Sequence, residues 1–536
     1  MNELTHIELF AGCGGMSLGL EAAGFNLLFA NELSPMAGET FAYNILGEDL
    51  EFMSEINEKA NKTIWIKSNF NRDNLKGRLR ENPFDTSKGE YSDLNPGIDL
   101  SDKLLIGNID DLLDFFDKNR EIVNSLERAD VDLISGGPPC QSFSLAGKRE
   151  KNNEKNQLPL SFSKLAGIIK PKTILLENVK GITSPFIEGG NKYYAWLEVS
   201  KAFVLEGFVP VCMMLNSKYF GVPQNRPRFI LIGYRKDIFE KILKKEKKNK
   251  ILELSNNFYN LVYDNKNNVE KITVKDFKYY DIETNPELFD GNILPKITNF
   301  NNKFKTTDEA IGDIKSAEFN YKLNETEGVY AKTLNEIFKN KSFLNIESIQ
   351  NHEPRNHSFI VKSRFRFYQV IEQFQNGLKR GAKDLLIGKN ISKDLISKLK
   401  NEFSQHELLF FENGKEISKI PKNIDMVENL IKSIPSRKHS QRALNKFEPA
   451  PSQLTIPDDL CHYDTEHPRT LTVREMARFQ SFPDWFVFKS KVTTGGKMRK
   501  FEVPQYTQVG NAVPPLLAKV LGETIKSQLE KINKKV

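Results

Sequence analysis

Short apolar segments alternate with longer amphipathic ones over residues 1–235. Four of the short segments are bounded by turn-forming residues, and each has the length of a strand rather than a helix: Ile7 to Phe10, Asp132 to Ile134, Thr173 to Leu176 and Phe229 to Ile232. Runs that are apolar at consecutive positions are typical of strands buried on both faces, as in parallel sheets. The alternation with helices therefore predicts a Rossmann-like, doubly wound α/β domain with parallel strands.

The pattern changes twice along the chain, which predicts three zones. We expect the α/β domain over 1–240 with a polar insertion at about 46–105, a smaller irregular α+β domain over 241–450, and a return segment over 451–536 that completes the first domain. In the return segment we expect one helix to start near Thr472 and another to run from about Pro515 to Lys531.

Charge and cysteine content narrow the class of protein. The 241–450 zone holds 37 Lys and Arg against 28 Asp and Glu, so it carries the excess positive charge of a chain whose net charge is +7. Such a block suits a polyanion such as DNA, although a generally lysine-rich surface would look the same. No apolar run approaches the roughly 18 residues of a membrane span, and the first residues show no secretory signal. Four widely spaced cysteines fit neither a disulfide framework nor a zinc site, so we expect a cytoplasmic protein.

A glycine-rich turn follows the first predicted strand, in the segment IELFAGCGGMSLGL. Gly12 and Gly14 allow close approach of a ligand to the backbone, and the following helix offers free N–H groups. The spacing differs from the GxGxxG of dinucleotide sites, and a tight turn without a ligand is the alternative. Glu32 ends the next apolar run, where a carboxylate can accept both hydroxyls of a ribose or can simply be solvated.

The segment LLIGNIDDL places Asn108 and Asp110 after a further apolar run. A polar side chain there can accept from an adenine amino group, or it can cap the helix that follows. Polar tips on three strands beside a glycine turn predict a nucleoside pocket without naming the nucleoside.

A cysteine occurs in a second loop, in DVDLISGGPPCQSFSLAG. Pro138 and Pro139 stiffen this loop ahead of Cys140, and a thiol in a Gly/Pro loop is more often reactive than one in an apolar helix. Glu177, in ILLENV, ends another predicted strand and would face the same cleft as an acid, unless it caps a helix. In GVPQNRPRFILIG, Arg226 and Arg228 share one face of a strand and suit a phosphate or a carbonyl oxygen.

Together these segments resemble the cytosine-5 DNA methyltransferases of the bacterial restriction–modification type. The resemblance is carried by an ordered set of motifs: IELFAGCGGMSLGLEAAGF, GGPPCQSFS, ENV, GVPQNRPRFILIG, RTLTVREMARFQSFPDWF and QVGNAVPPLLA. It covers about half the chain, and it implies transfer of a methyl group from S-adenosylmethionine to carbon 5 of cytosine, with S-adenosylhomocysteine as the other product and no metal.

The resemblance also implies roles for the loop residues. Cys140, after Pro139, matches the nucleophile that adds to carbon 6 of the ring, and Glu177 matches the group that protonates or hydrogen-bonds N3. Asn178 would brace the catalytic loop, Arg228 would lie near the cytosine O2, and Arg226 would support the loop and contact the DNA backbone. Two further residues, Gln141 and Ser142, would contact the DNA beside the emptied base position.

For the donor, the resemblance implies a pocket built by Phe10, Gly12, Gly14, Glu32, Asn108, Ile109, Asp110, Asn511 and Val513. Glu32 would hold the ribose, and Phe10 would pack on the adenine or sulfonium region. Asn108 departs from the aspartate that the family usually has opposite adenine N6, which leaves Asp110 as the fallback acceptor.

The 241–450 zone lies where the family has its target recognition domain, which must stabilise a flipped-out cytosine. The arginines that we expect to contact DNA there are Arg364 and Arg366, in HEPRNHSFIVKSRFRFYQ, and Arg437 and Arg442, in SRKHSQR. A half-buried strand with ordinary exposed arginines is the alternative. Arg474, in RTLTVRE, would cap a helix or orient this domain.

Three other functions compete with this hypothesis. They are a tRNA cytosine-5 methyltransferase of the same family, a DNA-binding protein without activity, and a nicotinamide dehydrogenase, whose glycine spacing does not fit. The DNA hypothesis predicts a monomeric enzyme that acts on double-stranded DNA without any membrane, in the bacterial cytoplasm at the nucleoid. A cognate restriction endonuclease would be its genetic rather than physical partner.

Overall fold

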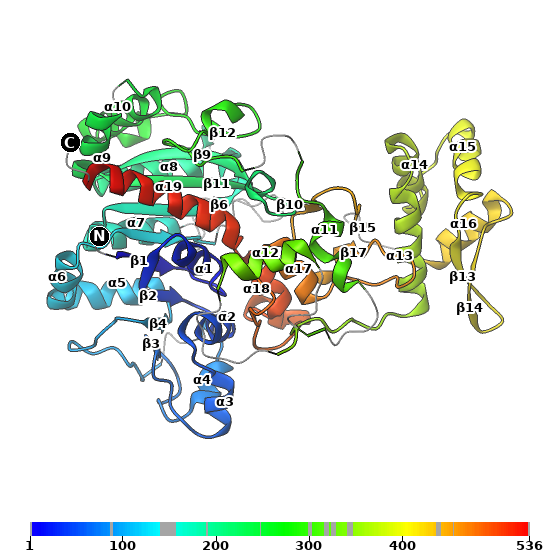
Figure 1. Ribbon diagram of the computed structural model, residues 1–536, viewed down its shortest axis with the longest axis horizontal. Helices are drawn as coiled ribbons and strands as arrows, with labels where there is room; N and C mark the ends of the chain where they lie inside the picture. Colours follow the sequence, from blue (N-terminus) through cyan, green and yellow to red (C-terminus); the bar gives the residue numbers. More distant parts are fainter. Residues whose placement is uncertain are drawn as a thin grey trace.

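The structure is a computed structural model that describes residues 3–85, 89–139, 157–188, 191–246, 248–298, 303–315, 321–322, 328–339, 347–435, 441–453 and 455–533. A nine-stranded sheet with the order β12-β9-β11-β6-β5-β1-β2-β4-β3 forms its centre (Figure 1). In chain order the strands are β1 (Leu4–Leu9), β2 (Phe25–Glu32), β3 (Thr63–Trp65), β4 (Lys103–Ile106), β5 (Leu133–Gly136), β6 (Thr173–Val179), β9 (Phe208–Asn216), β11 (Pro227–Arg235) and β12 (Tyr280–Asp281).

The strands from β6 to β3 in this order pair in parallel, as the sequence predicts. The prediction was wrong for Phe229 to Ile232, because β11 runs antiparallel to both of its neighbours, β6 and β9. An antiparallel strand inside a mixed sheet is buried on both faces just as a parallel one is. A continuous apolar run therefore identifies the strand but carries no information on its direction.

Helices cover the sheet in two layers, which confirms the doubly wound α/β class. One layer contains α1 (Gly15–Ala22), α9 (Lys236–Lys245) and the terminal α19 (Pro515–Asn533), and α2 (Pro35–Phe41) packs on β2 and β4. The other contains α5 (Ile109–Lys118), α6 (Arg120–Arg128), α7 (Leu158–Ile169) and α8 (Ala195–Leu205). The helix expected from Pro515 is confirmed, and it lies against α1, so the end of the chain completes the domain at its beginning.

The insertion at 46–105 extends the sheet rather than forming a loop. Its TIWI segment supplies β3, the edge strand beside β4, and it also contains α3 (Leu50–Glu55) and α4 (Leu75–Leu79). Arg78 of α4 is buried, lies 5.1 Å above the ring of Trp65, and pairs with Asp93 at 2.7 Å. A buried pair with a ring beneath the guanidinium fixes the insertion on the sheet edge.

Residues 248–298 also pack on the sheet. They form α10 (Lys250–Asp264), which contacts β9, and the short strand β12 at the far edge. Phe258 of α10 stacks on Phe277 with ring centroids 3.9 Å apart, and both are buried in the core of the sheet domain. The sequence predicts that a separate domain starts at residue 241, whereas residues 248–298 pack on the sheet. Their polar composition conceals the amphipathic helix α10.

A second hydrophobic cluster joins the sheet domain to the rest of the chain. It contains α11 (Thr307–Ile311), α12 (Val329–Ile337), α17 (Val473–Phe479) and α18 (Gln505–Asn511). The helix expected to start near Thr472 is confirmed, since Thr472 is the N-cap of α17 and forms a capping box with Glu475.

The outer lobe, residues 359–435, projects away from the sheet domain (Figure 1). It contains α13 (Phe359–Glu372), α14 (Asn376–Leu386), α15 (Lys393–Phe403), α16 (Ile424–Ser433) and the hairpin of β13 (Leu408–Glu412) and β14 (Lys415–Lys419). Its own core surrounds Phe367 and Phe403. In Figure 1, α13 and α14 lie on the side that faces the sheet domain, whereas α15 and the hairpin lie on the far side.

The remaining described strands are short pairs outside the central sheet. They are β7 (Phe186–Glu188) with β8 (Asn191–Tyr193), β10 (Gln224–Asn225) with β16 (Ala450–Pro451), and β15 (Arg442–Ala443) with β17 (Leu460–Cys461). Among the residues that the structure describes, no helix combines the length and the apolar character needed to cross a lipid bilayer.

Candidate active site

The glycine turn after β1 has the backbone shape that a ligand cradle needs. Phe10 and Gly12 have φ of 55° and 56°, and α1 begins three residues after Gly12. No atom lies within 4 Å of the position where a Cβ of Gly12 would be, so the space in front of the turn is open. Left-handed backbone beside open space, at the N-terminus of a helix, is the geometry that phosphate- and nucleoside-binding turns share.

Glu32, at the end of β2, is bonded to this turn. Its Oε2 accepts from the N–H of Gly12 and its Oε1 from the N–H of Ser34, both at 2.8 Å. Burial raises the pKa of Glu32, while these backbone bonds oppose that rise. Each oxygen can accept a further hydrogen bond, so the carboxyl can hold a diol without leaving the turn.

The next strand tip lies beside Glu32, since the N–H of Gly107 donates to the Glu32 carbonyl at 2.9 Å. Asn108 caps α5, with its Oδ1 accepting from the N–H of Asp110 at 3.0 Å. Asp110 is exposed and accepts from the hydroxyl of Ser161 at 2.6 Å, and Ile109 between them is buried. The capping role expected as the alternative for Asn108 is therefore present, and one lone pair of its Oδ1 is used by the cap.

The C-terminal motif reaches the glycine turn through close helix packing. A Cβ on Gly15 would lie 2.4 Å from the carbonyl oxygen of Val513, and one on Gly19 would lie 2.4 Å from that of Pro515. Only glycine permits α19 to approach α1 this closely. Val513 is consequently buried next to the turn, while Asn511, at the end of α18, stays exposed.

An acid and an arginine meet at the adjacent strand tips. Arg228 Nε lies 2.7 Å from Glu177 Oε1, and both side chains are about nine-tenths buried. Burial lowers the pKa of the Arg228 guanidinium, and the charge of Glu177 opposes that change. The other oxygen of Glu177, Oε2, lies 3.1 Å from where a Cβ of Gly137 would be, so it faces the loop that leads to Cys140.

Asn178 holds the same loop from its other side. Its Nδ2 donates to the carbonyl of Pro138 at 3.1 Å, and its Oδ1 accepts from the N–H of Val179 at 2.8 Å. Pro139 is exposed, and Cys140, Gln141 and Ser142 lie outside the described residues. The structure thus brings the glycine turn, Glu32, Glu177, Arg228 and the start of the cysteine loop to one edge of the sheet.

Comparison with known proteins gives this arrangement a family. The model described as "C-5 cytosine-specific DNA methylase" matches residues 4–71 and 108–527. The chain belongs to that family. The unmatched residues fall mostly within the insertion that carries β3 and α4. Membership implies that the methylase uses S-adenosylmethionine as methyl donor and acts on DNA.

Two of the similar proteins are bacterial type II methyltransferases. The methylase is 24% identical to Type II methyltransferase M.DdeI of Desulfomicrobium norvegicum, over 98% of this chain and 89% of that protein. It is 25% identical to Type II methyltransferase M1.HphI of Haemophilus parahaemolyticus, over 97% and 86%. The match to the crystal structure of S. pombe Dnmt2 methyltransferase covers 99% of both chains at 14% identity, with a TM-score of 0.40.

Arg226 differs from its expected place in the methylase. It was expected to lie beside Arg228 and contact DNA, but it is 1% exposed. Its guanidinium donates to the carbonyls of Gly510 and Ala512, at 2.9 and 3.1 Å. Burial lowers its pKa well below the usual value, and the neighbouring charge of Arg228 adds to that effect. Arg226 therefore ties β11 to the segment around Asn511 and is not available to a phosphate.

The outer-lobe arginines differ in the same way. The segment that contains Arg364 and Arg366 is helix α13, not a strand. Arg364 donates to the carbonyls of Ile434 and Pro435 at the end of α16, at 3.2 and 2.5 Å, and Arg366 donates to the carbonyl of Thr465. Arg364 therefore binds within the outer lobe, and Arg366 ties the lobe to the segment around Thr465. Arg437 lies outside the described residues, and Arg442, in β15, is exposed.

Sequence reasoning named Arg474 but missed the buried ion pairs in and after the RTLTVRE motif. Arg469 binds Glu475 through two contacts of 2.7 Å, and Arg478 binds Asp484 at 2.8 and 2.7 Å. Arg474 donates to the carbonyls of Gln350, Pro483 and Phe486, and burial lowers its pKa to about 10. It thereby connects α17 to the segment before the outer lobe. The signal in the sequence was that charged residues recur within the otherwise apolar segment RTLTVREMARFQSFPDWF, which indicates charges buried in a core.

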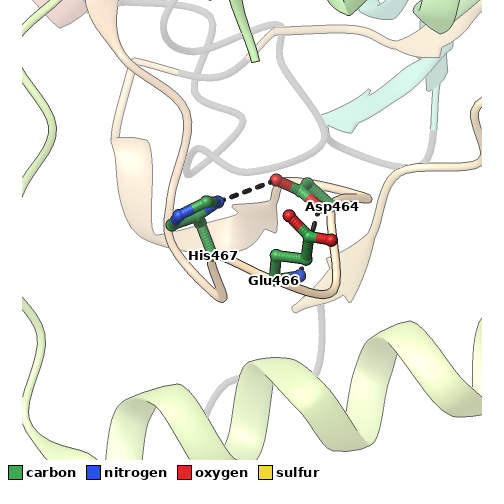
Figure 2. Close-up of side chains that lie close together, drawn as sticks. All are labelled: Asp464, Glu466 and His467. Atoms are coloured by element: carbon green, nitrogen blue, oxygen red, sulfur yellow. Dashed lines mark hydrogen bonds and ion pairs between the residues drawn. The ribbon is translucent and has the colours of Figure 1, made fainter. Parts of the chain in front are cut away.

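A turn beside α13 brings Asp464, Glu466 and His467 within 4.8 Å of one another (Figure 2). Asp464 Oδ2 and His467 Nδ1 are 3.1 Å apart, and Asp464 Oδ1 accepts from the Glu466 N–H at 3.1 Å. These hydrogen bonds close a turn, which explains why the three side chains lie together. That the methylase needs no metal stays a prediction.

Proposed function

We propose that this methylase transfers a methyl group from S-adenosylmethionine to carbon 5 of a cytosine flipped out of duplex DNA, with Cys140 as nucleophile. The observation that carries the proposal is the Glu177–Arg228 pair, which faces the loop after β5, and β5 lies next to the strand that leads into the glycine turn. Glu177, Arg228 and the thiol of Cys140 would then face the cytosine next to the donor site.

The donor site fits an adenosyl sulfonium compound. Glu32 would accept the ribose hydroxyls, the open turn at Gly12 would take the methionine part, and Asn108 or Asp110 would receive the adenine amino group. Phe10, Ile109 and Val513 would supply apolar walls, and Asn511 would close the site from the C-terminal side. When bound, the donor supplies an electrophilic methyl group.

Separate residues of the protein would attack carbon 6, protonate or hydrogen-bond N3 and contact O2. The thiolate of Cys140 forms a bond to carbon 6, and Glu177 donates a proton or a hydrogen bond to N3, so that negative charge does not build up on the ring. Arg228, held by Glu177, would contact the cytosine O2. After carbon 5 has taken the methyl group, water removes the carbon 5 proton and the Cys140–carbon 6 bond breaks, which restores the aromatic ring and the thiolate. A proton that Glu177 has given to N3 then returns to Glu177.

Asn178 and Arg226 would act by positioning. Asn178 holds Pro138, two residues before the thiol, and Arg226 holds the carbonyls on both sides of Asn511. Gln141 and Ser142 would follow the thiol against the DNA, and Arg442 would contact DNA from the side of the outer lobe.

A covalent trap tests the proposal. Duplex DNA in which cytosines are replaced by 5-fluorocytosine, incubated with donor, should become attached to the protein at Cys140, because fluorine cannot leave as a proton does. Cys140→Ser should bind DNA but trap none. With labelled donor, transfer to tRNA and not to duplex DNA would overturn the choice of substrate.

We further propose that the methylase protects DNA against a cognate restriction endonuclease, as the type II names of its relatives suggest, and that it acts as a monomer. A nuclease gene beside its own, whose product cuts unmethylated but not methylated DNA, would support this role. Bisulfite sequencing of DNA treated with the enzyme would identify the target sequence.

A further inference from the structure

Helix α14 carries a row of cations on the inner side of the outer lobe. Lys379 and Lys383 are one turn apart, and Arg442 of β15 lies close enough to act on the charge of Lys383. Lys379 pairs with Glu372 of α13, whereas within the described residues neither Lys383 nor Arg442 forms an ion pair. Three cations therefore share one carboxylate.

The packing of α14 leaves Lys379 and Lys383 out of its buried stripe. Gly381, Ala382 and Leu386 are buried, and a Cβ on Gly381 would lie 2.7 Å from the side chain of Leu395 in α15. The helix is thus pressed against the far half of the lobe by its small residues. Lys383 lies off that buried stripe, on a helix that stands on the side of the lobe facing the sheet domain (Figure 1).

Lys383 stands in an unfavourable electrostatic environment. Burial lowers the pKa of Lys383, and the charges of Lys379 and Arg442 lower it further, against the single opposing charge of Glu372. Like charges held together in a partly buried place repel one another, and a phosphate backbone between them would turn repulsion into attraction.

We propose that Lys379, Lys383 and Arg442 form a phosphate-binding row that holds the backbone of duplex DNA between the outer lobe and the sheet domain. The proposal rests on the proposed function and refines it. The DNA contacts on this side of the protein come from α14 of the outer lobe and from β15, which packs on α13, because the guanidinium groups of Arg364 and Arg366 bind carbonyls of the protein. Contacts of this kind position DNA without reading its sequence.

The test compares two charge-matched pairs of substitutions. Lys383→Gln with Arg442→Gln removes two cations of the row, and Lys393→Gln with Lys400→Gln removes two exposed cations of α15 on the far side of the lobe. Binding of a fluorescein-labelled random-sequence duplex is measured by anisotropy over a series of salt concentrations.

We expect the row variant to lower the slope of log Kd against log salt by about two, one for each lost phosphate contact, and the α15 variant to leave it unchanged. The row variant should raise the KM for DNA while kcat and the affinity for S-adenosylmethionine stay as in the parent. Lys383→Arg with Arg442→Lys, which keeps both charges, should keep the slope.

An unchanged slope in the row variant, or an equal loss in the α15 variant, would overturn the proposal. If the double variant does not fold, Arg442→Gln alone removes an exposed side chain and should lower the slope by about one. Transfer of label to tRNA only would refute the proposed substrate, while the slope with duplex DNA would still decide whether this row binds phosphate.

Discussion

The strongest test of the buried charge network is Arg478→Met. The guanidinium of Arg478 is fully buried in α17, and it contacts Asp484 at 2.8 and 2.7 Å and also Asp313. Methionine keeps the apolar length of the side chain but leaves Asp484, which is 1% exposed, without its cation.

Breaking a buried pair by removing one partner costs about 3–5 kcal/mol, because the remaining charge is uncompensated. We expect a loss of that size in the free energy of unfolding of the unit that contains α17. Lys362→Met is the matched control, since Lys362 lies 3.3 Å from Glu416 in a pair exposed on both sides, which contributes below about 1 kcal/mol.

The assay is urea unfolding followed by tryptophan fluorescence, with Trp485 next to the pair as the reporter. The double variant Arg478→Met with Asp484→Leu should recover part of the loss, because it removes the stranded carboxylate as well. A loss below about 1 kcal/mol for Arg478→Met, equal to that of Lys362→Met, would refute the reasoning that the motif is held by buried charge.

Three further outcomes follow from the site. Gly19→Val should lower both the melting temperature and the affinity for S-adenosylmethionine, because its Cβ would lie 2.4 Å from the Pro515 carbonyl; calorimetry should show both losses, and Gly377→Ala, where the space is open, should show neither. Asn178→Ala should lower kcat about tenfold by freeing the Pro138 carbonyl, about 1.4 kcal/mol, with donor affinity unchanged in single-turnover and binding assays; an unchanged kcat would argue against loop positioning. Burial raises the pKa of Glu8 to about 8, against a hydrogen bond from Ser17, so the folded protein should lose stability as pH rises from about 4.5 to about 8; Glu8→Gln should flatten that dependence in urea midpoints, and an equal slope in parent and variant would exclude Glu8 as its source.

Several features of the protein were decided by local sequence. The apolar runs that become β1, β5 and β6 are flanked by glycine and proline, and such short-range patterns are sufficient to define strands and turns. The Thr472 cap and the helix from Pro515 were equally readable, because capping depends on neighbours within one turn. The position of the glycine turn after β1 and of Glu32 at the end of β2 was readable for the same reason.

Other features were decided only by the tertiary structure. Three examples are the direction of β11, the strand formed by TIWI and the packing of α10 on the sheet. Each depends on which edges and faces of the sheet the rest of the chain leaves exposed. Arg226 and Arg364 looked like phosphate ligands, but their partners are backbone carbonyls 284 and 70 residues away. Every residue has a carbonyl, so such a partner leaves no mark in the sequence, and only the folded chain shows which arginines remain free for DNA.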